Sequence, residues 1–340
     1  MDPGQRLVDH LYTSFSIDAE WAAREPRGFT WWGGPCAQRI WAEEAYDDKG
    51  VVISRVHAST DLVRIVEPTE KILRVLSATA NFATMSGFTI EDGAVQSRAS
   101  VWVHEGTLEM WKHIFAVAAA VQNASAQIEA KALAVALGCQ PALSAHPDSG
   151  IRDDLDDMLN VIEAVIAPMG RGTSKFIGPD FTAAERVAGP RVSVLTTASD
   201  DGLTSELAFG NDTSMLLMMT DQPNPRLGSG LLSVLTLPIR LPEAEIPKRI
   251  FELNRLEVEE LNHAPFLGSW CKHPSLDGLI AHVSFLPNVC ALPNLPMQLL
   301  MYAAARNQWA AGILSASEPQ GPPSEPPKSA ITRFFDRFKM

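Results

Sequence analysis

The sequence lacks any hydrophobic run long enough to cross a membrane. Its longest apolar stretch, from Ile114 to Val121, is far shorter than the ~20 residues that span a bilayer. The first residues also lack a basic region followed by an apolar run, so we expect no signal peptide. Both absences favour a cytoplasmic protein that does not insert into a membrane.

Basic residues are in deficit, with 28 Lys and Arg against 40 Asp and Glu and a net charge of −12. Nucleic acids and anionic membranes both attract basic surfaces, so we expect neither as a partner. The 340 residues, 46% of them hydrophobic, are enough for about two globular domains of ~150 residues, each with its own core.

Cysteine is scarce, and the usual catalytic signatures are missing. The four cysteines show no zinc-binding spacing, which predicts free thiols in a reducing compartment (Cys36, Cys139, Cys271 and Cys290). No GxGxxG, phosphate-binding lysine loop, HExxH or GxSxG occurs. We therefore expect no enzyme, no metal and no cofactor.

Three polar clusters could still carry chemistry. His146 shares one loop (residues 146–150) with an Asp and a Ser, but the members of a catalytic triad usually meet from separate elements, which favours a turn. The acidic residues within 153–157 suit the positive end of a helix better than a metal ion. His273 beside Cys271 lacks two further ligands nearby. Each cluster is better explained by structure than by catalysis.

One stretch of the sequence occurs twice, as residues 64–105 and 249–289. Arg64 corresponds to Arg249, and the turn Asp92-Gly93 to Asp277-Gly278, at a constant offset of 185 residues. Each copy is followed by a long helix rich in alanine. Such a repeat defines the architecture. It predicts an α+β fold of two tandem modules, each an antiparallel sheet with helices packed on one face.

Periodicity and turn residues place the elements of both modules. In the first we expect helices at 5–15, from Pro68 and at 107–137, and strands at 38–42, 51–56, 59–66, 82–90 and 94–104. In the second we expect helices at 152–167, 242–262 and after Pro293, and strands at 192–198, 203–209, 213–220, 230–241 and 279–286. The helix at 152–167 is interpreted as the opening helix of the second module, equivalent to 5–15.

These elements define three parts of the chain. Residues 1–138 form the first module, and residues 139–314 contain a connection and the second module. Residues 315–340 are a Pro-rich linker and a basic amphipathic tail, which we expect to be disordered. The alternative is a docking peptide, because Phe334, Phe335 and Phe338 share one face of a helix.

The strand at 94–104 alternates apolar side chains with mostly polar ones, which predicts a sheet covered on one side only. Large apolar groups on the polar face of such a sheet usually mark a contact surface. Methionines add soft side chains that suit either a core or a groove for varied partners. We therefore predict a peptide-binding groove on the exposed sheet faces, lined by Trp31, Trp32, Trp102, Trp270, Met215 and Met218.

Two segments carry a resemblance to a known family. Thr30 to Glu43 has the pattern TWW-x5-QR-x-WAE, and His146 to Leu159 the pattern HP-x-SG-x-R-x-D-x-DDML. With the order α-β-β-β-α-β-β-α, residues 5–314 resemble the actinobacterial tandem families of type III secretion chaperone-like, YbjN-like peptide-binding chaperones. The resemblance implies a groove for an extended peptide or a partly unfolded protein client, without nucleotide hydrolysis. It also implies a monomer in which the two modules form a pseudo-dimer, or a homodimer.

Three functions remain open at this point. The first is non-catalytic binding of a polypeptide client, and the second is a regulatory scaffold in which residues 331–340 dock on the protein or on a partner. The third is a hydrolase that uses the His146 loop. The first is favoured.

Overall fold

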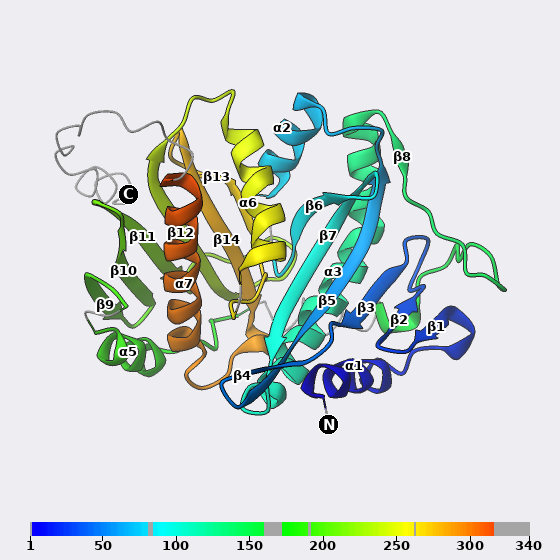
Figure 1. Cartoon of the computed structure of the whole chain (residues 1–340), viewed down its shortest axis with the longest axis horizontal. Helices are drawn as coiled ribbons and strands as arrows, with labels where there is room; N and C mark the ends of the chain where they lie inside the picture. Colours follow the sequence, from blue (N-terminus) through cyan, green and yellow to red (C-terminus); the bar gives the residue numbers. More distant parts are fainter. Residues whose placement is uncertain (1, 81–83, 160–171, 190–191, 262, 316–340) are drawn as a thin grey trace.

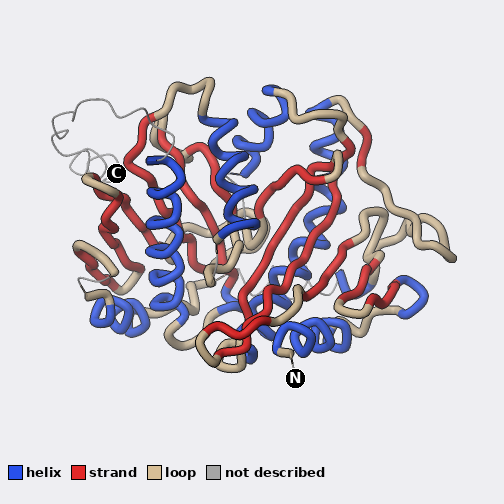
Figure 2. Tube along the Cα trace, viewed as in Figure 1, coloured by secondary structure: helices blue, strands red, loops and turns tan. Residues whose placement is uncertain are grey.

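The computed structural model describes residues 2–80, 84–159, 172–189, 192–261 and 263–315 (Figure 1). Two antiparallel sheets lie side by side, and helices pack against them (Figures 1 and 2). The α+β fold of two modules predicted from the repeat is confirmed.

The first sheet is built from the strands of residues 22–103 and from one short strand that follows α3. Its spatial order is β1 (Ala22–Glu25), β2 (Gly28–Trp31), β3 (Gln38–Ala42), β5 (Val51–Arg64), β7 (Ala94–Val103) and β6 (Gly87–Glu91). Two short strands also pair with β5, namely β4 (Tyr46–Asp48) and β8 (Gln140–Pro141). The helices of this module are α1 (Pro3–Ser14), α2 (Glu70–Thr79), α3 (Leu108–Leu137) and the short η1 (Ala19–Trp21).

The second sheet repeats the same arrangement. Its spatial order is β13 (Ser269–Lys272), β14 (Leu279–Pro287), β12 (Gly230–Arg240), β11 (Asp212–Met219), β10 (Gly202–Phe209) and β9 (Leu195–Ser199). Its helices are α5 (Gly178–Val187), α6 (Ile246–Glu260), α7 (Leu295–Ser315) and the short η3 (Asn288–Cys290). Read from the opposite edges, β1-β2-β3-β5-β7-β6 matches β9-β10-β11-β12-β14-β13, so the two modules share one topology.

Local sequence signals explain where several elements begin and end. The Asp2 carboxylate accepts the N–H of Gly4 at 2.8 Å and caps α1. Asp92 and Gly93 have φ values of 50° and 71°, which is the backbone of a tight hairpin turn between β6 and β7. Gly138, with φ 70°, ends α3 in the left-handed conformation that glycine adopts without strain.

Three predictions about elements are wrong or incomplete. The opening helix of the second module is α5, whose ten residues bury only Phe181 and Ala184 and therefore show little periodicity. In the predicted helix 152–167, the helical residues that are described begin only at Asp157, and its remainder lies outside the described residues. The expected strands 51–56 and 59–66 are one strand, β5, because β7 pairs with it along most of its length. The pattern also missed β1 and β2.

The two modules share one hydrophobic core. A single cluster of buried apolar side chains runs from Leu7 on α1 to Leu314 on α7 and includes Trp111 and Phe285. The Trp111 ring on α3 stacks on Tyr302 of α7 with centroids 6.3 Å apart. The two modules are therefore packed against each other through this core and are not separate domains joined by a linker.

A backbone segment of each module also forms hydrogen bonds with a strand in the sheet of the other module. Ser100 of β7 exchanges two backbone hydrogen bonds with Phe266, at 3.1 and 2.8 Å. Phe285, which holds the position of Ser100 in the second copy, donates its N–H to the carbonyl of Thr84 at 3.0 Å. The segments that precede β6 and β13 thus cross, and each pairs with a strand of the other module's sheet.

The crossing needs glycine where the two backbones meet. A Cβ on Gly87 would lie 2.5 Å from the carbonyl oxygen of Gly268 and 2.6 Å from the ring of Phe266. Both distances are shorter than any real Cβ contact, and one partner is backbone. Gly87 therefore permits the close approach of the two sheets.

We predict that Gly87→Ala lowers the free energy of unfolding by about 1–3 kcal/mol, because the new methyl group overpacks the crossing. Urea unfolding followed by tryptophan fluorescence measures it. The control is Gly312→Ala on α7, where a Cβ meets nothing within 4 Å. Alanine is the better helix former, so this control gains up to ~1 kcal/mol. Equal stability of Gly87→Ala and the wild type would contradict the crossing described here.

Candidate functional site

The tryptophans of the predicted groove are buried. Trp31 and Trp270 are 0% exposed and belong to the shared core, and Trp32 is 5% exposed with its ring edge against His146. The prediction of an open groove lined by these side chains is therefore wrong. The indole rings stabilise the fold instead.

Trp102 does lie on the polar face of the first sheet, as predicted, but the second module covers it to 9% exposure. Its Nε1 donates to the carbonyl of Leu261 at 3.2 Å, and the His263 ring lies 5.7 Å away. The Arg55 guanidinium lies over the Trp102 ring, 4.9 Å from its centroid. A pattern within β7 could not reveal this cover, because it comes from a distant part of the chain.

The methionines of β11 point to opposite sides of the second sheet. Met218 is 1% exposed and lies in the core, so its assignment to a groove is wrong. Met215 lies on the other face and is only partly buried. Successive side chains of a strand alternate between faces, so Leu217 and Met219 share the face of Met215. Among the predicted groove residues, Met215 is the one that remains on an accessible sheet face.

Met215 belongs to a partly exposed apolar surface that we call the outer face of the second sheet. Its members are Leu195 of β9, Met215, Leu217 and Met219 of β11, and Leu232 of β12. Strand register places Leu195 and Met215 on either side of Glu206, and Met219 next to Leu232. Leu195 is 56% exposed and Leu217 8%, while the others are intermediate.

The helices of the second module leave this outer face open. Phe181 and Ala184 of α5 pack with Leu203 and Leu207 of β10, which point to the opposite face. Figure 1 shows α7 on that same opposite face of the sheet. Toward β14 the outer face is covered by the first module, where Ala80 packs with the cluster around Val283. The uncovered part thus lies over β9, β10 and β11.

This surface ends in an unpaired strand edge. β9 pairs with β10, and within the described part of the chain no strand pairs with its other side. Val194 and Leu195 at the start of β9 are 64% and 56% exposed. Backbone N–H and C=O groups at such an edge can pair with an added strand.

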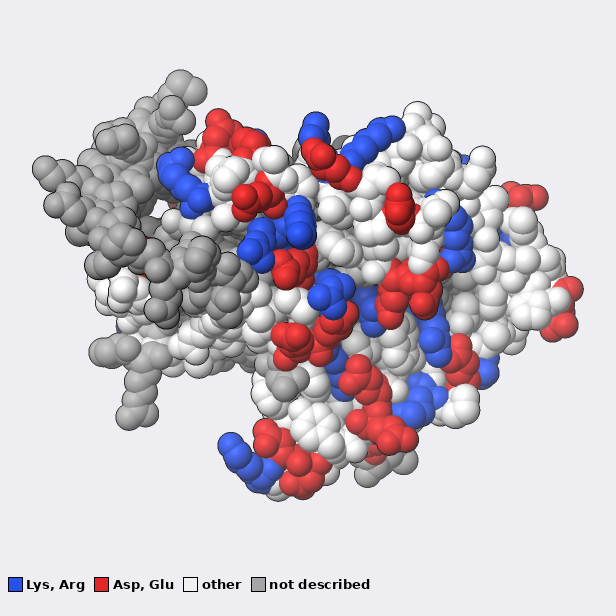
Figure 3. Space-filling model, turned by 45° about the horizontal axis from the view of Figure 1, so that its top comes forward, with Lys and Arg blue, Asp and Glu red and all other residues white. Residues whose placement is uncertain are grey.

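The equivalent face of the first sheet has a different chemistry, because its charges are paired with one another. Trp41 stacks on His57 with centroids 4.8 Å apart, and the guanidiniums of Arg39 and Arg98 lie 5.0 and 5.4 Å from its ring. The ion pairs of this face are Arg39–Glu25 and Arg98–Glu91, and the Nε2 of His57 is hydrogen-bonded to Glu43 at 2.7 Å. Figure 3 shows intermingled acidic and basic side chains across the middle of the molecule. Such a surface presents little apolar area.

A buried ion pair joins α6 and α7 on the face of the second sheet that the helices cover. The Nε of Arg306 donates to Glu257 at 2.8 Å, and Trp270 Nε1 donates to the same carboxylate at 2.6 Å. Arg306 also donates to the carbonyl of Pro265 at 2.7 Å, and Arg55 of the first sheet to the carbonyl of Glu257 at 3.3 Å. Burial raises the pKa of Glu257, and the charge of Arg306 opposes that rise. The pair is thus part of the contact between the modules.

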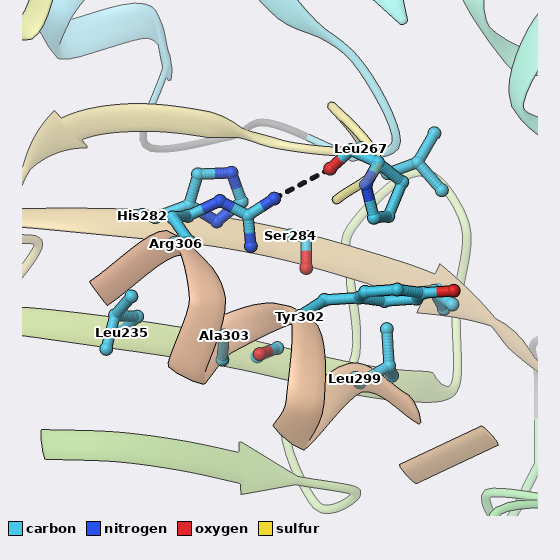
Figure 4. A pocket seen from close by; sticks show the side chains of 11 residues that line it. Leu235, Leu267, His282, Ser284, Leu299, Tyr302, Ala303 and Arg306 are labelled. Atoms are coloured by element: carbon cyan, nitrogen blue, oxygen red, sulfur yellow. Dashed lines mark hydrogen bonds between the residues drawn. The ribbon is translucent and has the colours of Figure 1, made fainter. Parts of the chain in front are cut away.

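A small cavity beside this pair is lined by His282, Ser284, Tyr302 and Arg306 among others (Figure 4). Its volume of about 20 Å³ has room for roughly one water molecule. The Nε2 of His282 is buried there without a partner, and burial holds its pKa well below the ordinary value. The cavity is too small to bind a substrate.

The loop of His146 is a turn, as its sequence favoured. Its Nδ1 accepts the N–H groups of Asp148 and Ser149, both at 3.2 Å, while the Ser149 hydroxyl donates to the carbonyl of Glu20 at 3.3 Å. His273 accepts two backbone N–H groups through its own Nδ1 in the same way. Sequence reasoning predicted the turn at His146, but it did not predict that the imidazole ring of each His-Pro pair accepts the hydrogen bonds that close the turn.

The acidic residues near 153–157 also have a structural role. Asp156 accepts the N–H of Met158 at 2.8 Å at the start of a helix and pairs with Arg152 at 2.9 Å. Within the described residues, no group of three or more His, Cys, Asp or Glu could hold a metal ion. The cysteines are free, and burial raises the pKa of Cys36 to about 11, which makes its thiol unreactive.

Comparison with known proteins assigns no relatives: no family model, curated protein or solved structure matches the chain. None of the described helices is both long enough and apolar enough to span a membrane. The outer face of the second sheet, with the β9 edge, is therefore the candidate site on geometry alone.

We predict that His57 makes the stability depend on pH. Burial lowers the pKa of His57 to about 4 against the opposing effect of its hydrogen bond to Glu43, and the charges of Arg55 and Arg98 add to the lowering. The unfolded side chain titrates near 6.5. Between these values the unfolded state binds the extra proton, so stability is lost as the pH falls from about 6.5 to 4. His57→Gln should reduce this loss by up to ~1.4 kcal/mol per pH unit in urea unfolding.

The matched control is His104→Gln, which changes a histidine beyond the end of the same sheet. The prediction requires the dependence of stability on pH to change more in His57→Gln than in this control. An unchanged dependence in His57→Gln would show that His57 is not buried in its neutral form.

Proposed function

We propose that the protein binds an extended or partly unfolded polypeptide segment, without catalysing a reaction, on the outer face of the second sheet. The observation that carries this proposal is a set of apolar side chains on the outer face of a sheet that ends, two strands away, in an unpaired strand edge. Leu195 of β9 and Met215 of β11 are the accessible members of this set, Met219 lies nearer the first module, and β9 supplies the edge. The two features together match what an extended polypeptide offers, namely backbone hydrogen bonds and alternating side chains.

The chemistry of such binding follows from the two surfaces. A segment that adds to β9 satisfies its own N–H and C=O groups, and every second side chain then lies beside Leu195 on the outer face. Methionine side chains are flexible and polarisable, so they adapt to different apolar partners. Binding of this kind selects for apolar, extended segments more than for one sequence.

The resemblance to tandem peptide-binding chaperones supports the same proposal from the sequence. The repeated order of elements and the crossing of the two modules agree with a pseudo-dimer held in one chain. We accordingly propose a monomer as the binding unit, located in the cytoplasm, with a polypeptide client as its partner. The paired charges of the first sheet favour the second sheet as the place of contact.

We predict that Met215→Arg weakens binding of an unfolded polypeptide about tenfold or more. A charge placed among the apolar side chains of the outer face must lose water when the client docks, and a tenfold loss corresponds to ~1.4 kcal/mol. The measurement is fluorescence anisotropy with a reduced, alkylated and fluorescein-labelled polypeptide that cannot fold.

The matched control is Val66→Arg, which adds the same charge at a side chain that is 101% exposed and far from β11 in sequence. Its affinity for the probe should equal that of the wild type. Loss of affinity in both variants, or in neither, would contradict a site on the outer face of the second sheet.

A further inference from the structure

We infer that residues 331–340, ITRFFDRFKM, dock on the outer face of the second sheet of the same chain and compete there with the client. The inference rests on the function proposed for that face, and it adds an internal regulator to it. Three observations lead to it: the reach of the chain beyond α7, the apolar pattern of the segment, and the charge around the face.

The segment can reach the face. Asn307 of α7 donates to the carbonyl of Ala208 at 2.7 Å, which places the helix against the end of β10. Ser315 follows eight residues later, about 12 Å along the helix axis. Residues 316–330 can extend over as much as ~50 Å. Neighbouring strands lie ~4.8 Å apart, so β11 is only ~10 Å from the β9 edge, and the linker is long enough to pass around that edge to the other face.

The apolar side chains of the segment match the surface. Ile331, Phe334 and Phe338 recur at intervals that place them on one side of a helix, with Phe335 beside them. The outer face offers the partly exposed Met215, Met219 and neighbouring side chains without a described helix above them. Methionine next to an aromatic ring is a favourable contact.

The charges are complementary as well. Residues 331–340 contain Arg333, Arg337 and Lys339 against a single acidic residue, in a chain whose net charge is −12. Glu206 stands in the middle of the outer face between Leu195 and Met215. The turns that border the face carry exposed acidic side chains at Asp200, Asp201 and Asp212. This face therefore attracts a basic segment more strongly than an acidic segment.

A tethered competitor changes client affinity by a predictable amount. A short flexible linker gives an effective concentration in the millimolar range. A segment with a dissociation constant of about 0.1 mM as a free peptide would then occupy the face about nine-tenths of the time. Client affinity would be reduced about tenfold, and a client that binds tightly would still displace the segment.

The test uses the full chain with Phe334→Ser, Phe335→Ser and Phe338→Ser combined. Hydrogen exchange of the backbone amides in residues 195–219 should become faster, and the unfolded probe should bind about tenfold more tightly than to the wild type. A synthetic peptide of residues 331–340 should bind the triple variant and compete with the probe. The matched control substitutes three linker residues, Pro322→Ser, Pro323→Ser and Pro326→Ser, and should behave like the wild type.

The outcomes separate this inference from the function on which it rests. If the probe binds but the triple variant changes neither exchange nor affinity, the tail does not dock and the proposed function stands. If the peptide binds the triple variant while the probe binds neither form, the docking holds and the proposed function fails. Amide protection that rises with protein concentration would overturn the inference, because the segment would then come from a second copy.

Discussion

The crossing of the two modules is the constraint on which the rest of the structure depends. The segments before β6 and β13 pass so close that Gly87 faces the backbone of Gly268, and each continues the sheet of the other module. Beside the crossing, Glu257 holds Arg306 and Trp270 in a buried network that also reaches Arg55 of the first sheet. Neither module can move away without exposing that network and dividing the shared core.

The crossing also decides which surfaces remain for function. It covers the polar face of the first sheet around Trp102 and the inner strands of the second sheet around Val283, because each module places residues over the other. What is left uncovered differs between the copies. In the first module this face carries arginines that stack on Trp41 and pair with acidic side chains, whereas in the second it presents Met215, two strands from the β9 edge. One topology thus yields two faces of unlike chemistry.

The sequence predicted what local signals control and missed what distant contacts control. The Asp92-Gly93 turn, the end of α3 at Gly138 and most strands follow from turn residues and periodicity, so they could be predicted together with the tandem modules. α5 has few apolar residues and escaped the same reasoning. The cover over Trp102 comes from Leu261, 159 residues away, so no pattern within β7 contains it. Among the predicted site residues, only Met215 lies on an accessible face. The alternation of side chains along a strand shows which residues share a face, but it does not show which of the two faces the helices cover.

The central claim, that a polypeptide docks on the outer face of the second sheet, is tested most directly by site-specific photo-crosslinking. A benzoylphenylalanine placed at Met215 reports on that face, and one placed at Arg39 reports on the equivalent face of the first sheet. With a purified unfolded polypeptide as the only partner, we predict crosslinks from position 215 and none above background from position 39. Crosslinks from position 39 alone, or equal yields from both positions, would contradict the account.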